Sequence, residues 1–203
     1  MSSDQQKWDQ RYRDKPLILP TPPRFIEQSI KLMQPGTVLD LASGDGAASL
    51  CLAKAGFDVV AVDISAEALE RLQQFAIMLG VSIRTVQVDL AADDWLAMLD
   101  EVVPGPINNI VITRYKPSLA LWHQLATRLA PEGMMLLTSF NLKQHEQHGF
   151  NSRFCLQPAE FTGADPQLHL RYSASVQQDD DFMDEYLFEK GEPEASGTDI
   201  HGG

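Results

Sequence analysis

The chain has 203 residues, of which 44% are hydrophobic and 22% charged, and its formal net charge is −12 at pH 7. This length favours one domain with a full core, and the acidic balance disfavours DNA and other nucleic acids, whose phosphates call for basic patches. No apolar run approaches the roughly 20 residues that span a bilayer, and the polar N-terminus has no signal-peptide core. We therefore expect a soluble globular protein in the cytoplasm, without a membrane partner. The two cysteines predict neither a disulfide framework nor a metal site.

The chain begins with polar and proline-rich segments. Trp8 and Tyr12, four residues apart, give a predicted helix over 4–14 one aromatic face. The prolines that follow interrupt this helix, and Thr21 is expected to cap a second helix that runs to about Met33.

The most informative stretch, 38–46, reads Val-Leu-Asp-Leu-Ala-Ser-Gly-Asp-Gly. An apolar run ends just beyond Asp40 and turns through two glycines, and a second apolar run, about twenty residues later, ends in Asp63. This order predicts a strand, a tight turn, a helix and a second strand with an acid at its tip. Such a unit forms a nucleoside pocket at the carboxyl ends of parallel strands, where Asp63 can accept hydrogen bonds from ribose hydroxyls.

The residues of the turn indicate which nucleoside. Ser49 stands where a dinucleotide fingerprint has its third glycine, and Asp45 lies at the centre of the turn with Asp40 at its entry. These carboxylates would repel phosphates but suit a cation. S-adenosylmethionine brings an ammonium and a sulfonium, and its carboxylate can bind backbone N–H groups at a helix start. The alternative is a generic Rossmann turn without this ligand.

The rest of the chain alternates strands and helices. We predict helices over 46–55, 66–79 (capped by Ser65), 93–100 and 117–130, strands over 37–41, 58–63, 82–88, 107–113 and 134–139, a loop over 140–157, and two final antiparallel strands over 167–176 and 182–190. This pattern predicts a doubly wound, mostly parallel seven-stranded α/β sheet with an antiparallel C-terminal hairpin. We expect one domain over 1–190 and a disordered tail over 191–203.

The pattern Asp40-x-Ala42-x-Gly44-x-Gly46 resembles motif I of the class I S-adenosylmethionine-dependent methyltransferases. Further parts of the chain resemble the tellurite-resistance and thiopurine-type small-molecule branch of that family. They are Trp8 to Tyr12 with the Thr-Pro-Pro at 21–23, the segments 114–117 and 131–137, and the stretch 150–161. The resemblance covers about 8–190 and is strongest at 38–63. It implies that segment 1–34 is a lid over the cofactor.

The resemblance also implies roles for individual residues. The methionine end of the cofactor would be held by Asp40, Ala42, Ser43, Gly44, Asp45 and Gly46. Asp63 would bind the ribose, Ile64 and Leu90 would contact the adenine ring, Asp89 would accept from the adenine amino group, and Trp8 and Arg11 would close the lid. As alternatives, Asp89 caps the following turn, Ile64 and Leu90 belong to the core, and Trp8 only packs.

Candidates for catalysis are weaker. Arg114 follows the fourth predicted strand and can bind the cofactor carboxylate or an anionic substrate, or else form a surface ion pair. Tyr12 and Tyr115 are candidates for the substrate side, and His145 is a candidate general base that is otherwise an exposed loop histidine.

Three functions stay open. The first is methyl transfer to a small molecule, supported by the acidic charge and by the absence of an Asn/Asp-Pro-Pro-aromatic motif after the fourth predicted strand. The others are a methyltransferase that acts on protein or RNA, and an S-adenosylmethionine-binding module without catalysis. The sequence does not indicate the acceptor or the oligomeric state.

Overall fold

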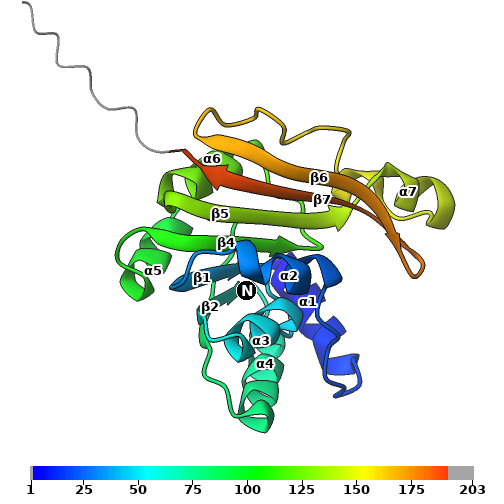
Figure 1. The fold of residues 1–203 in the computed structure, drawn as a ribbon. Coiled ribbons are helices and arrows are strands. Elements are labelled where there is room, and N and C mark those ends of the chain that lie inside the picture. Colours follow the sequence, from blue (N-terminus) through cyan, green and yellow to red (C-terminus); the bar gives the residue numbers. More distant parts are fainter. Residues whose placement is uncertain (1, 192–203) are drawn as a thin grey trace, which may run out of the picture.

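Seven strands form a single sheet in the order β3-β2-β1-β4-β5-β7-β6 (Figure 1). This computed structural model describes residues 2–191. The strands are β1 (Thr37–Leu41), β2 (Asp58–Asp63), β3 (Arg84–Gln87), β4 (Ile107–Thr113), β5 (Leu129–Phe140), β6 (Leu168–Gln178) and β7 (Asp181–Lys190). The first five are parallel, and β7 runs antiparallel between β5 and β6.

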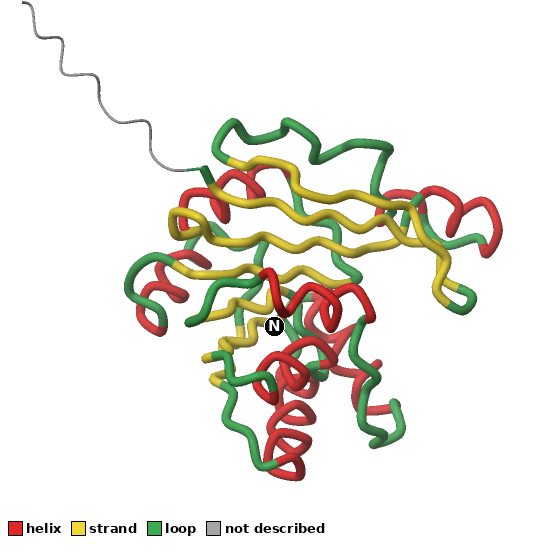
Figure 2. Tube along the Cα trace, in the orientation of Figure 1, coloured by secondary structure: helices red, strands yellow, loops and turns green. Residues whose placement is uncertain are grey.

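Helices cover both faces of this sheet (Figures 1 and 2). They are α1 (Ser3–Asp14), α2 (Arg24–Ser29), α3 (Ala47–Lys54), α4 (Ala66–Leu79), α5 (Trp95–Val102), α6 (Leu119–Arg128) and α7 (Leu142–His148), with short 3-10 turns η1 (Ile30–Leu32) and η2 (Ser152–Phe154). Helices α2, α3 and α4 pack on one face, which we call the front face, and α5 and α6 pack on the other. This arrangement confirms the predicted doubly wound fold.

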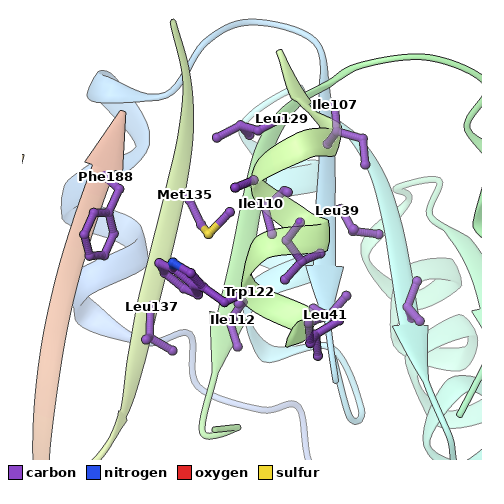
Figure 3. Close-up of a cluster of buried hydrophobic side chains, with 14 of the residues drawn as sticks. Leu39, Leu41, Ile107, Ile110, Ile112, Trp122, Leu129, Met135, Leu137 and Phe188 are labelled. Atoms are coloured by element: carbon purple, nitrogen blue, oxygen red, sulfur yellow. The ribbon is translucent and has the colours of Figure 1, made fainter. Parts of the chain in front are cut away.

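Burial on both sides explains why the central strands read as continuous apolar runs. All but the first residue of β2 are buried. On the face opposite the front face, Trp122 of α6 is fully buried against Met135, Phe188 and neighbouring apolar side chains (Figure 3). Its ring centroid lies 4.4 Å from that of Phe161. This core fixes the positions of β1, β4 and β5 in the middle of the sheet.

Several predicted boundaries agree with the structure. The bounds of β1, β2 and β4 are those expected, and α4 begins after the Ser65 cap, whose side chain accepts from the Ala68 N–H, and ends at Gly80 in the left-handed region. The final hairpin pairs Gln178 with Asp181. Predictions about the tail beyond Gly191 lie outside the described residues.

Other predictions were wrong. The stretch 140–157 is not a loop throughout, because it contains α7 and η2. Asn141 caps α7 by accepting from the Lys143 N–H, and Gln144 is buried and bonded to the Phe182 N–H. Thr21 does not cap the second helix, which begins only after Pro23. Within residues 2–191, none of the helices combines the length and apolar character that crossing a membrane requires.

Candidate functional site

The predicted glycine turn lies between β1 and α3, where the strand order reverses from β2-β1 to β1-β4. Ligands bind at such a switch point, outside the carboxyl ends of the strands. Ala42, Gly44 and Gly46 all have positive φ angles, of 53°, 55° and 88°. A Cβ atom built on Gly46 would lie 2.1 Å from Leu72 of α4, so only glycine allows this close approach of turn and helix.

Asp63, at the tip of β2, holds the turn in place. One carboxylate oxygen accepts from the Gly44 N–H at 2.8 Å, and the other accepts from the Ser65 N–H at 2.9 Å. Burial raises the pKa of Asp63, while these backbone hydrogen bonds act in the opposite direction. Because each carboxylate oxygen has two lone pairs, Asp63 retains acceptor capacity for a ligand.

Asp40 is the most buried acid of the site, with no exposed surface. Its Oδ2 accepts from the Ser49 hydroxyl at 2.5 Å, whereas Oδ1 is buried without a hydrogen-bond partner among the described residues. Burial raises the pKa of Asp40 to about 7. A buried carboxylate with an unused oxygen calls for a positive or donating group nearby.

Asp45 pairs with cations of the protein, and its predicted contact with the cofactor stays a prediction. Its Oδ2 pairs with Lys15 Nζ at 2.6 Å and lies 3.5 Å from Arg71 Nε. The Arg71 guanidinium also donates to the carbonyls of Lys15 and Pro16, at 2.8 and 2.7 Å. Asp45 is therefore neutralised by the protein itself, and it anchors the segment after α1. Sequence reasoning missed Lys15 and Arg71, because they come close to Asp45 only in the fold.

Helix α1 lies over the turn. A Cβ atom built on Gly44 would be 2.3 Å from the Tyr12 hydroxyl, which places this phenol against the turn. Burial, followed by the charges of Asp63 and Asp45, raises the pKa of Tyr12. Asp9, which sequence reasoning did not single out, accepts from the Ser65 hydroxyl at 2.7 Å and from the Glu67 N–H at 3.3 Å. These bonds tie α1 to the start of α4.

A surface pocket of about 270 Å³ opens beside β2 and β3. Its walls are Ile64, Gln87, Val88 and Asp89, together with Ser2 and Gln5 from the start of α1. Ile64 and Asp89 were expected here, and Asp89 also makes the alternative turn-capping bond by accepting from the Ala91 N–H. Leu90 packs partly buried against the core. No signal in the sequence pointed to Ser2 or Gln5, because their position depends on where α1 docks.

Arg114 forms the ion pair that was its alternative role. Its guanidinium donates to Asp181 of the final hairpin at 2.7 Å and is largely exposed. Tyr115 is half-buried against the core, and burial, with a contribution from Asp89, raises the pKa of its phenol. The Arg114 charge is therefore neutralised by Asp181 of the hairpin. Tyr115 lies close enough to Asp89 of the pocket for the Asp89 charge to act on its phenol.

The loop placement of His145 needs correction, whereas the lid roles of Trp8 and Arg11 stay predictions. His145 lies on α7, not in a loop, and its Nδ1 bonds the Phe150 carbonyl at 2.7 Å. Since a carbonyl only accepts, Nδ1 carries the proton there and Nε2 keeps its lone pair, so the role of His145 as a general base stays a prediction. The Arg11 guanidinium lies 5.2 Å from the Trp8 ring centre, and neither residue lines the pocket. Among the described residues there is no His, Cys, Asp and Glu grouping suited to a metal ion.

The sequence of this chain is similar to those of known proteins. The family model described as tellurite resistance protein TehB matches residues 6–111, just over half of the chain. The chain belongs to the TehB family. A curated relative, glycine/sarcosine N-methyltransferase from Halorhodospira halochloris, is 31% identical over 136 residues, which are 63% of this chain. The chain spans about half the length of that relative (48%).

Solved structures show the same fold as this member of the TehB family. TehB from Haemophilus influenzae superimposes with a TM-score of 0.65 at 15% identity, covering 92% of this chain and 66% of the other. Magnesium protoporphyrin IX methyltransferase from Synechocystis, solved with bound SAM, gives a TM-score of 0.62 at 18% identity and covers 93% and 80% of the two chains. A methyltransferase from Clostridium acetobutylicum gives 0.63 at 13% identity, with 94% of both chains covered. The fold is therefore that of the class I methyltransferases.

Proposed function

We propose that this TehB-family chain is an S-adenosylmethionine-dependent methyltransferase that acts on a small molecule. The observation that carries the proposal is the place of Asp63, which holds the glycine turn while the next residue, Ile64, lines the pocket together with Asp89. Family membership and the N-methyltransferase relative support the same reaction. The cytoplasmic location and a lid formed by segment 1–34 stay predictions within this proposal.

The residues present fit the cofactor. Asp40 offers an unused buried oxygen near the turn, and Asp63 retains lone pairs for ribose hydroxyls. Ile64 and Asp89 present an apolar and an accepting surface in the pocket, as an adenine ring with its amino group requires. When bound, the cofactor supplies an activated methyl group. The chain then aligns the acceptor with it and excludes water, through α1 over the turn.

Calorimetric titration with S-adenosylmethionine, S-adenosylhomocysteine and NAD tests this function. We expect both sulfur nucleosides to bind and NAD not to bind. NAD binding, or no binding of any of the three, would contradict the proposal.

Replacing the acid at the tip of β2 tests the placement of the nucleoside. Asp63→Ala should weaken S-adenosylmethionine binding by about 1.5–3 kcal/mol, because it removes charge-assisted hydrogen bonds and loosens the turn. Asp58→Ala, at the exposed start of the same strand, is the matched control and should bind normally. Equal affinities of the two variants in the titration would place the nucleoside elsewhere.

A further inference from the structure

A row of polar side chains crosses the front face beside the site. The register pairs Thr113 of β4 with Thr138 of β5, and Thr138 with Glu185 of β7. Residues opposite each other in neighbouring strands point to the same face. Val111, Leu136 and Leu187, each two positions away from one of these residues, pack with α2, α3 and α4, so the row is on the front face.

The row starts next to the glycine turn. Strand β4 neighbours β1, and Asp40 pairs with Val111, two residues before Thr113. At about 4.8 Å per strand, Glu185 lies about 10 Å from Thr113 across the sheet. The row therefore leads from the predicted methionine end of the cofactor to Glu185, along the carboxyl ends of β4 and β5.

Glu185 of β7 is a buried carboxylate that meets no cation in the described part of the chain. It keeps 8% of its surface exposed, and its side chain accepts a hydrogen bond from the Tyr172 hydroxyl at 3.4 Å. Among residues 2–191, no Lys, Arg or His lies within ion-pair distance of it. Burial raises the pKa of Glu185. An unpaired buried carboxylate is costly, and a positively charged ligand would offset that cost.

Aromatic rings accompany this carboxylate. Tyr172 stacks on Phe25 of α2 with ring centres 5.9 Å apart. Phe140, two residues after Thr138 on the same face of β5, is half-buried, and its ring centre lies 4.7 Å from that of Phe150. The Tyr172 ring and the Glu185 carboxylate together attract ammonium groups, whereas the Phe140 ring already meets the Arg114 guanidinium, 5.9 Å from its centre.

We propose that Glu185, Thr138 and Thr113 bind the methyl acceptor, and that this acceptor is a small amine. The inference rests on the proposed methyl transfer. The bound ammonium first gives one proton to the Glu185 carboxylate, which frees the nitrogen lone pair. This lone pair forms the new bond to the methyl carbon while the carbon–sulfur bond breaks, and the electron pair of that bond stays on sulfur. The methylated product is again an ammonium, and the proton on Glu185 passes to water.

The test compares the wild type with Glu185→Gln and, as a matched control, Glu189→Gln. Glutamine keeps the shape of Glu185 and an acceptor for Tyr172 but removes the charge. Glu189 lies on the same face of β7 at its other end, opposite Met134, in a partly exposed pair with Arg171. Cofactor titration of all three proteins comes first, and equal affinities show that the variants are folded. If the wild type does not bind the cofactor, the proposed function fails and not the acceptor assignment.

Release of S-adenosylhomocysteine is then measured with glycine, sarcosine and dimethylamine, and with 2-mercaptoethanol and tellurite for comparison. We expect amine methylation, with kcat/KM at least about 30-fold lower in E185Q, as for loss of one partner of a buried charge pair, and unchanged in E189Q. Methylation of only the thiol or tellurite, no methylation of any amine by a wild type that binds the cofactor, or equal amine rates in E185Q and wild type would each overturn the assignment.

Discussion

Three buried acids surround the glycine turn, and each meets a different set of partners. Asp63 accepts from two backbone N–H groups and Asp45 pairs with Lys15 and Arg71. Asp40 accepts, within residues 2–191, only from Ser49. The same side-chain chemistry therefore serves to shape the turn, to anchor α1, and to present a free oxygen. These partners, not the residue type, separate the roles.

Gly44 lies so close to Tyr12 that the methyl group added by Gly44→Ala should disturb the site. Gly44→Ala puts a Cβ atom 2.3 Å from the Tyr12 hydroxyl at a φ of 55°, and should abolish S-adenosylmethionine binding in titration. Gly80→Ala, at a similar φ of 66° with nothing within 4 Å, is the control for backbone strain and should bind normally. Normal binding by Gly44→Ala would show that the close contact between Tyr12 and the turn is not needed for binding.

The raised pKa of Asp40 predicts how stability depends on pH. Its folded value of about 7 exceeds the unfolded value of about 3.9, so the native state binds the extra proton between them. The free energy of unfolding should fall as pH rises from about 4 to about 7, by on the order of 2–4 kcal/mol, and level off above that range. Asp40→Asn should remove this contribution in urea unfolding between pH 5 and 8, and an identical slope in both proteins would contradict it.

At the scale of the element, α1 depends on α4 for its position. Asp9 bonds Ser65 and Glu67, Arg13 pairs with Glu67, and Arg71 holds the carbonyls of Lys15 and Pro16. A twelve-residue polar helix has little stability of its own, so these contacts fix it. Loss of these contacts between α1 and α4 should therefore uncover the glycine turn.

Arg71 is the point at which this docking can be tested. Arg71→Ala should expose the bonds after Arg11 and Arg13 to trypsin about tenfold faster, because a buried guanidinium with two carbonyl partners and Asp45 is lost. Arg84→Ala, which removes an exposed pair with Asp58, should leave cleavage there unchanged. Limited proteolysis followed by mass spectrometry reads the difference, and equal cleavage of both variants would show that Arg71 does not hold the segment.

At the scale of the whole molecule, the sheet is held by a core that joins segments far apart in sequence. Trp122 of α6 lies against Phe161 and Phe188, at 4.4 and 5.2 Å between ring centres. These rings connect α6, the segment before β6, and β7. The core therefore keeps the final hairpin beside β5, where Glu185 joins the polar row.

Truncating the Trp122 side chain should destabilise the entire domain. Trp122→Ala should lower the free energy of unfolding by about 3–5 kcal/mol, because it leaves a large cavity in a fully buried region. Leu119→Ala, on the same helix and half exposed, should change it by less than about 1 kcal/mol. Urea unfolding gives both values, and a small loss for Trp122→Ala would mean that the core refills the space.

Local patterns allowed most of the fold to be predicted. Apolar runs bounded by glycine and acids gave the bounds of β1, β2 and β4, and Ser65 and Gly80 gave those of α4. Helix α7 was missed because it is short and polar and is stabilised by Asn141 and by the distant Phe182 N–H. Prediction therefore succeeded where the signal lies within one element.

The sequence by itself determined the nucleoside-type unit, since the glycine turn and Asp63 follow from residues within one strand–helix–strand stretch. Only the tertiary structure decided that Asp45 and Arg114 pair with opposite charges of the protein and that Glu185 has no such partner among residues 2–191. Ion pairs such as Arg114 with Asp181 join residues 67 positions apart. Charge is a property of a residue type, but its compensation depends on which chain segments the packed core brings together.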